Sequence, residues 1–258
     1  MDNKIRVLGI APYKSLQTAM EKLAEERNDL SLTVFLGDMQ EAVKITDKCD
    51  ISSYDIIISR GGTADLLQST VSLPVIEIPL SIYDILRAMK LAENDNGKHA
   101  IVGFPSITKN AHFLCDLLQY SIDIFSVHSV DELTGTLKQL QDASYHLILG
   151  DMITTSMAKE YNLASILITS GSESIEAAFD QAVKTCKDLS FLKERKDFYQ
   201  SVLNHTSENI VVFNQEGELI YSNADSLQPR VLEFLKSCLD KVLSEKEKSF
   251  YKEFEKQL

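Results

Sequence analysis

One stretch of the sequence, residues 54–87, brings together residue types that could hold a small anionic molecule. Residues 54–59 (YDIIIS) predict a short buried strand, because they are rich in β-branched residues and carry only one charge. Residues 60–63 (RGGT) follow directly, and a helix is expected from residue 64 with Thr63 as its N-cap. Paired glycines allow a sharp turn and a close approach of a ligand to the backbone. The guanidinium of Arg60 and the amides at the helix start could therefore bind an anion together.

Polar groups also follow the other predicted strands. The carboxyl ends of parallel strands lie at one edge of a sheet, where a doubly wound sheet binds its ligand. We therefore expect the ligand-binding residues to be Ser59, Arg60, Gly61, Gly62, Thr63, Ser81, Tyr83, Asp84, Ser106, Gly150, Asp151, Ser170, Gly171 and Ser172. This set, rich in hydroxyl groups and with one arginine, suits a small polyhydroxylated or carboxylated molecule. Asp151 would repel a carboxylate, so it is expected to accept a ligand hydroxyl or to cap its own helix.

A purely structural interpretation of the same residues stays open. Serine and threonine at the ends of strands commonly cap the following helix and touch no ligand. Arg60 could pair with Asp65 or Asp84 and only stabilise the first half of the molecule. The residues alone do not separate the two interpretations.

No set of catalytic residues is found in the sequence. The five histidines have no metal-ligand spacing, and the motifs of serine hydrolases and of nucleotide-binding loops are missing. Two-lobed amino-acid racemases place a cysteine at a strand end in each lobe, whereas Cys49 precedes a predicted strand and Cys115 and Cys186 lie within predicted helices. We expect no enzyme, no cofactor and no metal. The alternative is an isomerase or hydrolase that acts on a small carboxylic acid in the same cleft.

Strands and helices alternate along the first 170 residues. Strands are predicted at residues 4–10, 32–36, 54–59, 74–78, 99–104, 122–127, 145–149 and 164–168, with a helix after each. This alternation is typical of parallel sheets with right-handed crossovers. The predicted fold class is α/β: two Rossmann-like lobes, as in periplasmic binding proteins, with an interlobe cleft. Lobe 1 is expected to span about residues 1–80 and 173–190, and lobe 2 about residues 81–172, so that the sensing domain covers residues 1–190.

A long helix is predicted from Ser174. Apolar residues recur along it at alternating spacings of four and three over two heptads, which is the pattern of a coiled-coil seam: Ile175, Phe179, Ala182, Cys186 and Leu189. Two explanations stand with equal weight: the helix packs on lobe 1, or its first half forms the seam of a dimer. The charged residues 193–197 indicate a linker helix beyond it.

Residues 191–258 are expected to form a separate segment. Residues 197–223 predict a helix, a strand, a turn at residues 215–218 and a second strand, and they resemble the opening of a PAS domain. Residues 227–258 read as helical and charged, and two strands alone are only marginally stable. The segment is therefore either a PAS domain cut short or a reduced one, and we expect the former, so that the chain is a fragment of a longer protein.

Composition limits the classes of function. A 258-residue chain with 44% hydrophobic residues can bury a sizeable core. Its net charge of −12 implies no basic surface for nucleic acid. Four scattered cysteines suggest reduced thiols, and no signal peptide or membrane span is recognisable. We therefore expect a cytoplasmic protein without membrane contact.

The string SRGGTADLL, followed by PVIEIPLSIYDILRA, resembles the PrpR-type sensor domain of the propionate catabolism activator, a sigma-54-dependent transcription activator. The resemblance covers roughly residues 5–189. It implies an organic-acid effector in the cleft, typically 2-methylcitrate-like. It also implies an AAA+ ATPase domain that contacts the sigma-54 RNA polymerase holoenzyme, and a C-terminal helix-turn-helix domain that contacts DNA, both outside this chain. From the long helix, we expect a homodimer.

Overall fold

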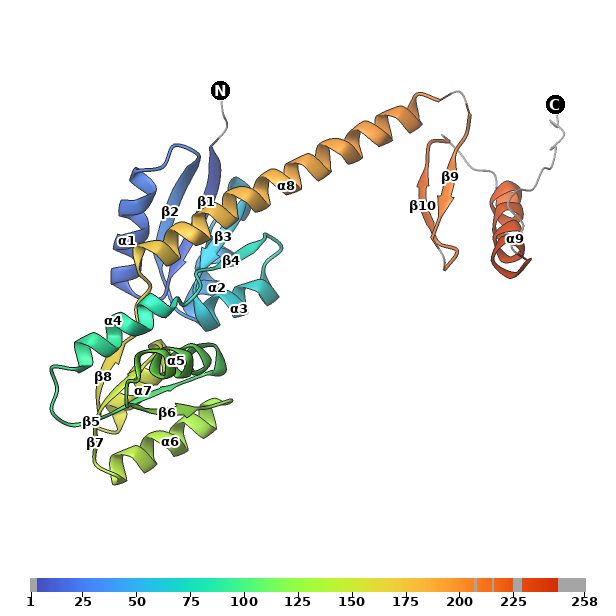
Figure 1. Ribbon diagram of the computed structural model, residues 1–258. Coiled ribbons are helices and arrows are strands. Elements are labelled where there is room, and N and C mark those ends of the chain that lie inside the picture. Colours follow the sequence, from blue (N-terminus) through green and yellow to red (C-terminus); the bar gives the residue numbers. More distant parts are fainter. Residues whose placement is uncertain (1–3, 207, 215, 225–228, 246–258) are drawn as a thin grey trace, which may run out of the picture. The chain divides into compact units, whose positions relative to one another are not determined.

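The computed structural model of the protein describes residues 4–206, 208–214, 216–224 and 229–245 (Figure 1). The chain divides into two compact units, Met1–Asp188 and Leu189–Leu258. The first unit contains two parallel sheets of four strands each, and we call the parts built around them lobe 1 and lobe 2.

Lobe 1 is built around the sheet with the strand order β2-β1-β3-β4. Its strands are β1 (Ile5–Ala11), β2 (Leu30–Leu36), β3 (Ile56–Ser59) and β4 (Val75–Glu77), and its helices are α1 (Lys14–Glu25), α2 (Gln40–Lys48), α3 (Gly61–Thr70) and the short 3-10 helix η1 (Ile51–Ser53). All strand pairs are parallel. The predicted alternation of strand and helix is therefore found.

Both faces of the lobe 1 sheet are buried because successive side chains of a strand point to opposite faces. In β3, Ile56 and Ile58 pack in a core with α1 and with the first half of α8 (Ser172–Asn204). Ile57, between them, packs on the other face with Ala42 of α2 and Leu67 of α3. Burial on both faces explains why β3 reads as a continuous apolar run.

Lobe 2 repeats this plan with the strand order β6-β5-β7-β8. Its elements are α4 (Ile82–Ala92), β5 (Lys98–Gly103), α5 (Pro105–Leu118), β6 (Asp123–Ser126), α6 (Val130–Asp142), β7 (Tyr145–Gly150), α7 (Met152–Glu160) and β8 (Ala164–Leu167). Helices α4 and α5 cover one face of the sheet, and α6 and α7 cover the other. The predicted fold class of two Rossmann-like lobes is confirmed.

The first half of α8 belongs to the core of lobe 1. Ile175, Phe179 and Ala182 are fully buried there, and Cys186 is 9% exposed. The hypothesis that these residues form a dimer seam is therefore wrong, and the alternative that the helix packs on lobe 1 is confirmed. Apolar residues at spacings of three and four fit the face of a sheet as well as a second helix, so the pattern could not decide between them.

The second unit contains a two-stranded antiparallel sheet, β9 (Val211–Phe213) and β10 (Leu219–Ser222), and the helix α9 (Pro229–Glu245). The predicted hairpin is thus found, although Gln215 of its turn lies outside the described residues. Asn223 ties the hairpin to the end of α8, since its amide donates to the Leu203 carbonyl at 2.8 Å. The assignment to a PAS domain stays a prediction, and residues 246–258 lie outside the described part.

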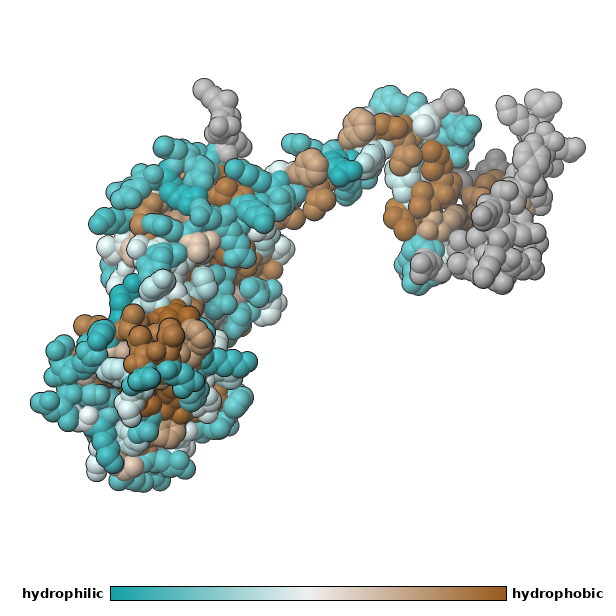
Figure 2. Space-filling view, in the orientation of Figure 1, coloured by the Kyte–Doolittle hydropathy of each residue, from teal (hydrophilic) through white to brown (hydrophobic). Residues whose placement is uncertain are grey.

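Exposed apolar side chains gather on one face of lobe 2. Figure 2 shows this face over α5, and the exposed large hydrophobic residues of α4 and α5 are Tyr83, Leu91, Phe113, Leu117 and Leu118. In the described part of the chain, no helix combines the length and the apolar character that crossing a membrane requires.

Candidate functional site

A cavity of about 250 Å³ lies between the two lobes at the carboxyl ends of their strands. It is lined by Arg60, Gly61, Gly62, Asp65, Glu77, Ile78, Leu80, Phe104, Ser106, Ile107, Asp151 and Ile153, and we call it the main cavity. In each sheet, the chain runs from the two central strands to outer strands on opposite sides. The position between these central strands is the topological switch point, where such folds bind ligands. The residues after β3, β5 and β7 all line this cavity.

A second cavity of about 60 Å³, the side cavity, shares part of this lining. It adds Pro12, Tyr13, Asp38, Met39, Thr63 and Met152 to Arg60, Gly61, Gly62, Asp151 and Ile153. The side cavity therefore completes the switch point of lobe 1 with the residues that follow β1.

Arg60 lies in both cavities and is held by two hydrogen bonds. It is placed by the end of β3, and its Nη1 donates to the hydroxyl of Tyr13 while Nη2 donates to the carbonyl of Ile168 at 2.8 Å. The described residues offer it no ion pair, so the alternative that it pairs with Asp65 or Asp84 is wrong. A guanidinium carries five N–H groups, and these two bonds leave three for a ligand.

Helix α3 begins at Gly61, and Arg60 is its N-cap residue, so the prediction that Thr63 caps this helix is wrong. Gly61 has φ +54°, a conformation that strongly favours glycine. The Thr63 hydroxyl instead donates to Asp38 at 2.6 Å and accepts from the amide of Met39 at 3.2 Å. These bonds connect the start of α3 to the loop before α2.

That loop contains a residue in an unfavourable backbone conformation. Met39 has φ 44° and ψ −115°, which costs a residue with a side chain about 1 to 3 kcal/mol. The Thr63 bond holds its amide in place. This part of the wall of the side cavity is therefore held by the hydrogen bond to Thr63 and not by the backbone preference of Met39.

Three carboxylates line the main cavity with few partners of their own. Glu77 ends β4, directly opposite Ser59 in the register. The side chain is exposed on one side, and its partial burial is the first cause that raises its pKa. The nearby Asp65 is the second cause, whereas the amide of Gly61 and the charge of Arg60 oppose the shift. Asp65 has no hydrogen-bond or ion-pair partner among the described residues. Asp151 caps α7 by accepting from Thr154 N at 2.8 Å, as one of its two predicted roles requires.

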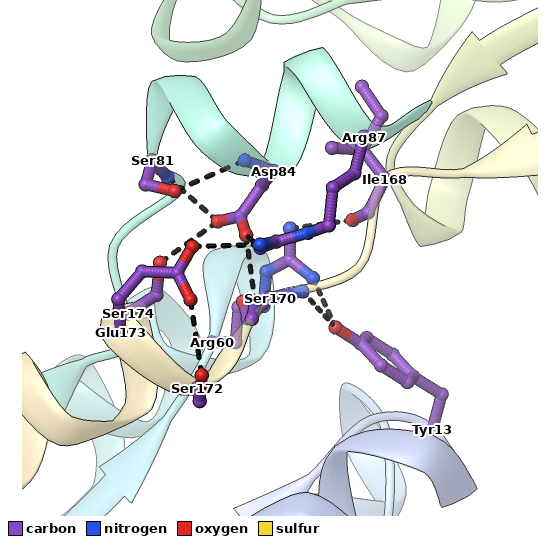
Figure 3. A network of polar contacts seen from close by, with 11 residues as sticks. Tyr13, Arg60, Ser81, Asp84, Arg87, Ile168, Ser170, Ser172, Glu173 and Ser174 are labelled. Carbon is purple, nitrogen blue, oxygen red and sulfur yellow. Dashed lines mark hydrogen bonds and ion pairs between the residues drawn. The ribbon is translucent and has the colours of Figure 1, made fainter. Parts of the chain in front are cut away.

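The two crossovers between the lobes are joined through the buried carboxylate of Asp84 (Figure 3). One oxygen accepts from the amide of Ser81 at 2.8 Å and from the hydroxyl of Ser174 at 2.9 Å. The other accepts from the amide of Gly171 at 2.8 Å and pairs with Arg87. Because Ser81 precedes α4 and Gly171 precedes α8, this Asp84 clasp ties the outgoing crossover to the returning one.

Further contacts close the hinge around this clasp. Arg87 also pairs with Glu173 at 2.8 Å, and Ser172 donates to the same carboxylate. The amide of Ser170 donates to the Tyr13 hydroxyl at 3.1 Å, so Tyr13 accepts from both Arg60 and the returning crossover (Figure 3).

The structure brings only part of the predicted site together. Arg60, Gly61, Gly62, Thr63, Ser106 and Asp151 line the two cavities. Ser81, Asp84, Ser170, Gly171 and Ser172 lie in the hinge. A ligand contact of these hinge residues stays a prediction.

Three more predicted residues lie outside the linings of both cavities. Ser59 is buried and donates to the carbonyl of Ile10 at 2.8 Å. Gly150 is closely covered, since a Cβ there would lie 2.6 Å from the side chain of Thr154. Tyr83 is 63% exposed. Their contact with a ligand also stays a prediction.

The sequence interpretation missed several residues of the lining. These are Pro12, Tyr13, Asp38, Met39, Asp65, Glu77, Ile78, Leu80, Phe104, Ile107, Met152 and Ile153. A usable signal existed for Glu77, which ends a predicted strand beside the strand of Ser59, and for Asp65, one helical turn after Gly61. Neither acid belongs to the hydroxyl groups and glycines on which the prediction rested.

Cysteine and histidine do not line either cavity. Burial raises the pKa of the Cys115 and Cys186 thiols, which makes them poor nucleophiles. Among the described residues, no group of three or more acids, histidines or cysteines could hold a metal ion.

Comparison with known proteins places this architecture in a family. The family model described as propionate catabolism activator matches residues 26–189. The crystal structure of an NtrC family transcriptional regulator from Clostridium acetobutylicum is 25% identical, with 71% of this chain and 97% of that chain covered and a TM-score of 0.60.

Two other solved structures are more remote. The transcription regulator CcpA of Lactococcus lactis is 11% identical, with coverage of 72% and 92% and a TM-score of 0.41. An ABC transporter periplasmic solute binding protein from Actinobacillus succinogenes, with bound D-allose, is 13% identical, with coverage of 72% and 92% and a TM-score of 0.37. The family match covers well over half of the chain, and the protein therefore belongs to the propionate catabolism activator family.

Proposed function

We propose that this chain is the ligand-sensing part of a sigma-54-dependent transcription activator, with the sensing domain at residues 1–190. A small organic acid bound between the lobes would control an AAA+ ATPase and a DNA-binding domain of the same regulator. The family membership and the likeness to an NtrC family regulator support this proposal. The ligand would act on transcription without being converted.

The main cavity is the observation that carries the proposal. It is lined from both lobes, so a ligand there touches β3 and β4 on one side and the loops after β5 and β7 on the other. Only two crossovers connect the lobes, and they lie side by side at the Asp84 clasp. A ligand that touches both lobes would favour the closed arrangement, and α8 leaves directly from the returning crossover.

Arg60 is the residue we assign to a carboxylate of the effector. Its guanidinium enters both cavities and has three N–H groups left after its bonds to Tyr13 and Ile168. A charge-assisted bond of this kind contributes about 1.5 to 3 kcal/mol. The start of α3 beside it has no side-chain cap, which leaves amides that favour negative charge.

A binding experiment tests the sensor proposal against the enzyme alternative. A thermal-shift screen of organic acids, amino acids and sugars identifies a ligand, since binding to the folded state raises the melting temperature. Hydrogen–deuterium exchange should then show slower exchange in residues 60–65 of lobe 1 and in residues 104–107 and 151–153 of lobe 2. Protection in one lobe only would contradict closure. Recovery of the bound molecule as a different compound, measured by NMR, would show an enzyme.

We also propose a homodimer, formed through the second half of α8. Phe191 and Phe198, and likewise Leu192 and Tyr199, are seven residues apart, and all four are 52–64% exposed. Apolar residues repeated every seven positions can pair with the same helix of a second copy. Phe198→Glu should lower the mass measured by light scattering, whereas Leu117→Glu, on α5, should leave it unchanged. The reverse result would place the contact on lobe 2.

A further inference from the structure

The main cavity carries more negative than positive charge, and this limits the ligand. Of its lining residues, only Arg60 is a cation, whereas Asp65, Glu77 and Asp151 are acids. Asp38 adds a fourth carboxylate in the side cavity, although it is engaged with Thr63. A molecule with several carboxylates would have to place at least one of them against this acidic wall.

The three acids of the main cavity are not neutralised by the protein. Asp65 has no hydrogen-bond or ion-pair partner among the described residues. Glu77 is favoured by the amide of Gly61 and, to a smaller extent, by the charge of Arg60, while Asp151 accepts from Thr154 with one oxygen. Arg60 directs two of its donors to Tyr13 and Ile168. Asp65 and Glu77 are exposed to solvent, so water stabilises their charge before a ligand binds, and a ligand that displaces this water has to supply a positive group in its place.

The electrostatics of Glu77 point in the same direction. Partial burial, and next the neighbouring Asp65, raise the pKa of this carboxyl more than the Gly61 amide and Arg60 lower it. A cation placed beside the two acids would lower that pKa again, and an ammonium group of an organic molecule is such a cation.

We infer that the main cavity binds a small zwitterion, such as an amino acid, whose carboxylate lies on Arg60 and whose ammonium group lies beside Asp65 and Glu77. This inference rests on the proposed sensing function and replaces the tricarboxylate that the family resemblance implied. The cavity volume of about 250 Å³ lies just below the usual range of ligand pockets and suits a molecule of this size. The guanidinium of Arg60 and the neighbouring carboxylates of Asp65 and Glu77 match the two ends of such a molecule.

The test compares probes that differ only in charge, on the 258-residue chain. The twenty standard amino acids are screened singly by thermal shift, beside citrate as a tricarboxylate and ribose as a neutral polyol. We expect at least one amino acid, and neither citrate nor ribose, to raise the melting temperature. By calorimetry, its 2-hydroxy analogue, which lacks the amine, and its amide, which lacks the carboxylate, should each bind at least tenfold more weakly.

Variants that replace an acid by its neutral amide should change the affinity for an amino acid and the affinity for citrate in opposite directions. Glu77→Gln and Asp65→Asn should each weaken the amino acid at least tenfold, because they remove a negative charge that faces the ammonium group. If citrate binds and Glu77→Gln strengthens it, the inference is overturned while the sensing function stands. If ribose binds and no amino acid does, the inference is likewise overturned while the sensing function stands. If no compound of any class binds, both the inference and the proposed site fail.

Discussion

Asp84 in the hinge and Glu77 in the main cavity are acids at the edge of the same interlobe region, yet they have opposite surroundings. The Asp84 carboxylate is fully buried and receives three hydrogen bonds besides the pair with Arg87. Glu77 is reached by solvent, has a raised pKa and is favoured only by the amide of Gly61 and by Arg60. A carboxylate that holds the fold together has its partners inside the protein, whereas Glu77, which we propose to contact the ligand, has few of them.

Removing the hinge carboxylate is the strongest test of this difference. Asp84→Ala should lower the free energy of unfolding by about 3 to 5 kcal/mol, because it leaves the amides of Ser81 and Gly171 and the hydroxyl of Ser174 without an acceptor. Urea denaturation at pH 7 measures the change. The control Arg87→Ala removes a half-exposed cation and should cost about 1 kcal/mol or less. Equal losses for both variants would contradict a special role of Asp84.

Arg60 lines the main cavity and also bonds to Ile168 at the returning crossover, so its removal should affect both ligand affinity and stability. Arg60→Ala should weaken a carboxylate ligand roughly ten- to a hundredfold and also lower the unfolding free energy by about 1 to 2 kcal/mol. Tyr13→Phe is the matched control, since it breaks the bonds to Arg60 and Ser170 and leaves the guanidinium in place. It should lower stability to a similar extent, and calorimetry should show a much smaller loss of affinity. If both variants lose affinity equally, Arg60 does not contact the ligand directly.

Gly61 and Gly62, at the start of α3, allow the effect of backbone conformation to be measured separately from the effect of steric room for a side chain. Gly61→Ala should cost about 1 to 2 kcal/mol, because φ +54° disfavours any side chain even though nothing lies near its Cβ position. Gly62 has no positive φ, and a Cβ there meets only Met39 at 3.5 Å. Gly62→Ala should therefore be neutral or raise stability by up to about 1 kcal/mol, as expected for a helical position. Thermal unfolding of the two variants gives the comparison, and a more stable Gly61→Ala variant would show that α3 begins elsewhere.

The smallest expected effect is the pH dependence due to Glu77. Its pKa is raised in the folded state, so the folded protein holds this proton more tightly than the unfolded chain. The contribution of Glu77 to stability should therefore fall as pH rises from its ordinary value of 4.5 to the higher folded value, and should stay constant above it. Glu77→Gln removes this loss and should be slightly more stable than the parent at pH 7 and equal at pH 3.5. Unfolding curves at both pH values test it, and a less stable variant at pH 7 would show that the charge is favourable.

Local patterns were sufficient to predict the fold. Strands such as β3 are apolar on both faces, and the helices between them carry one apolar side, so the alternation was readable without distant contacts. The ends of these strands then indicated where a ligand could bind, and Arg60 and Asp151 were placed at the cavities for that reason.

Contacts between distant residues could not be predicted in this way. The bond from Arg60 to Ile168 joins residues 108 positions apart, and the Asp84 clasp joins two crossovers about 90 positions apart. Ser81 and Asp84 form a capping box at the start of α4, which is a local pattern, but the same carboxylate also accepts from Gly171 and Ser174. Whether a polar residue at a strand end faces a ligand or the hinge depends on how the lobes meet, and one sequence does not contain that information in a local form.

The return of the chain to lobe 1 has a consequence for the order of folding during synthesis. The core of lobe 1 includes Ile175, Phe179 and Ala182 of α8, which follow all of lobe 2 in the chain. The elements of lobe 2 run without interruption from Ile82 to Leu167. All of its core residues therefore leave the ribosome before the last core residues of lobe 1 do. Domains usually fold from the N-terminus as they are made. In this protein we expect the N-terminal strands to keep one apolar face only partly covered, by α1, until the first turns of α8 emerge.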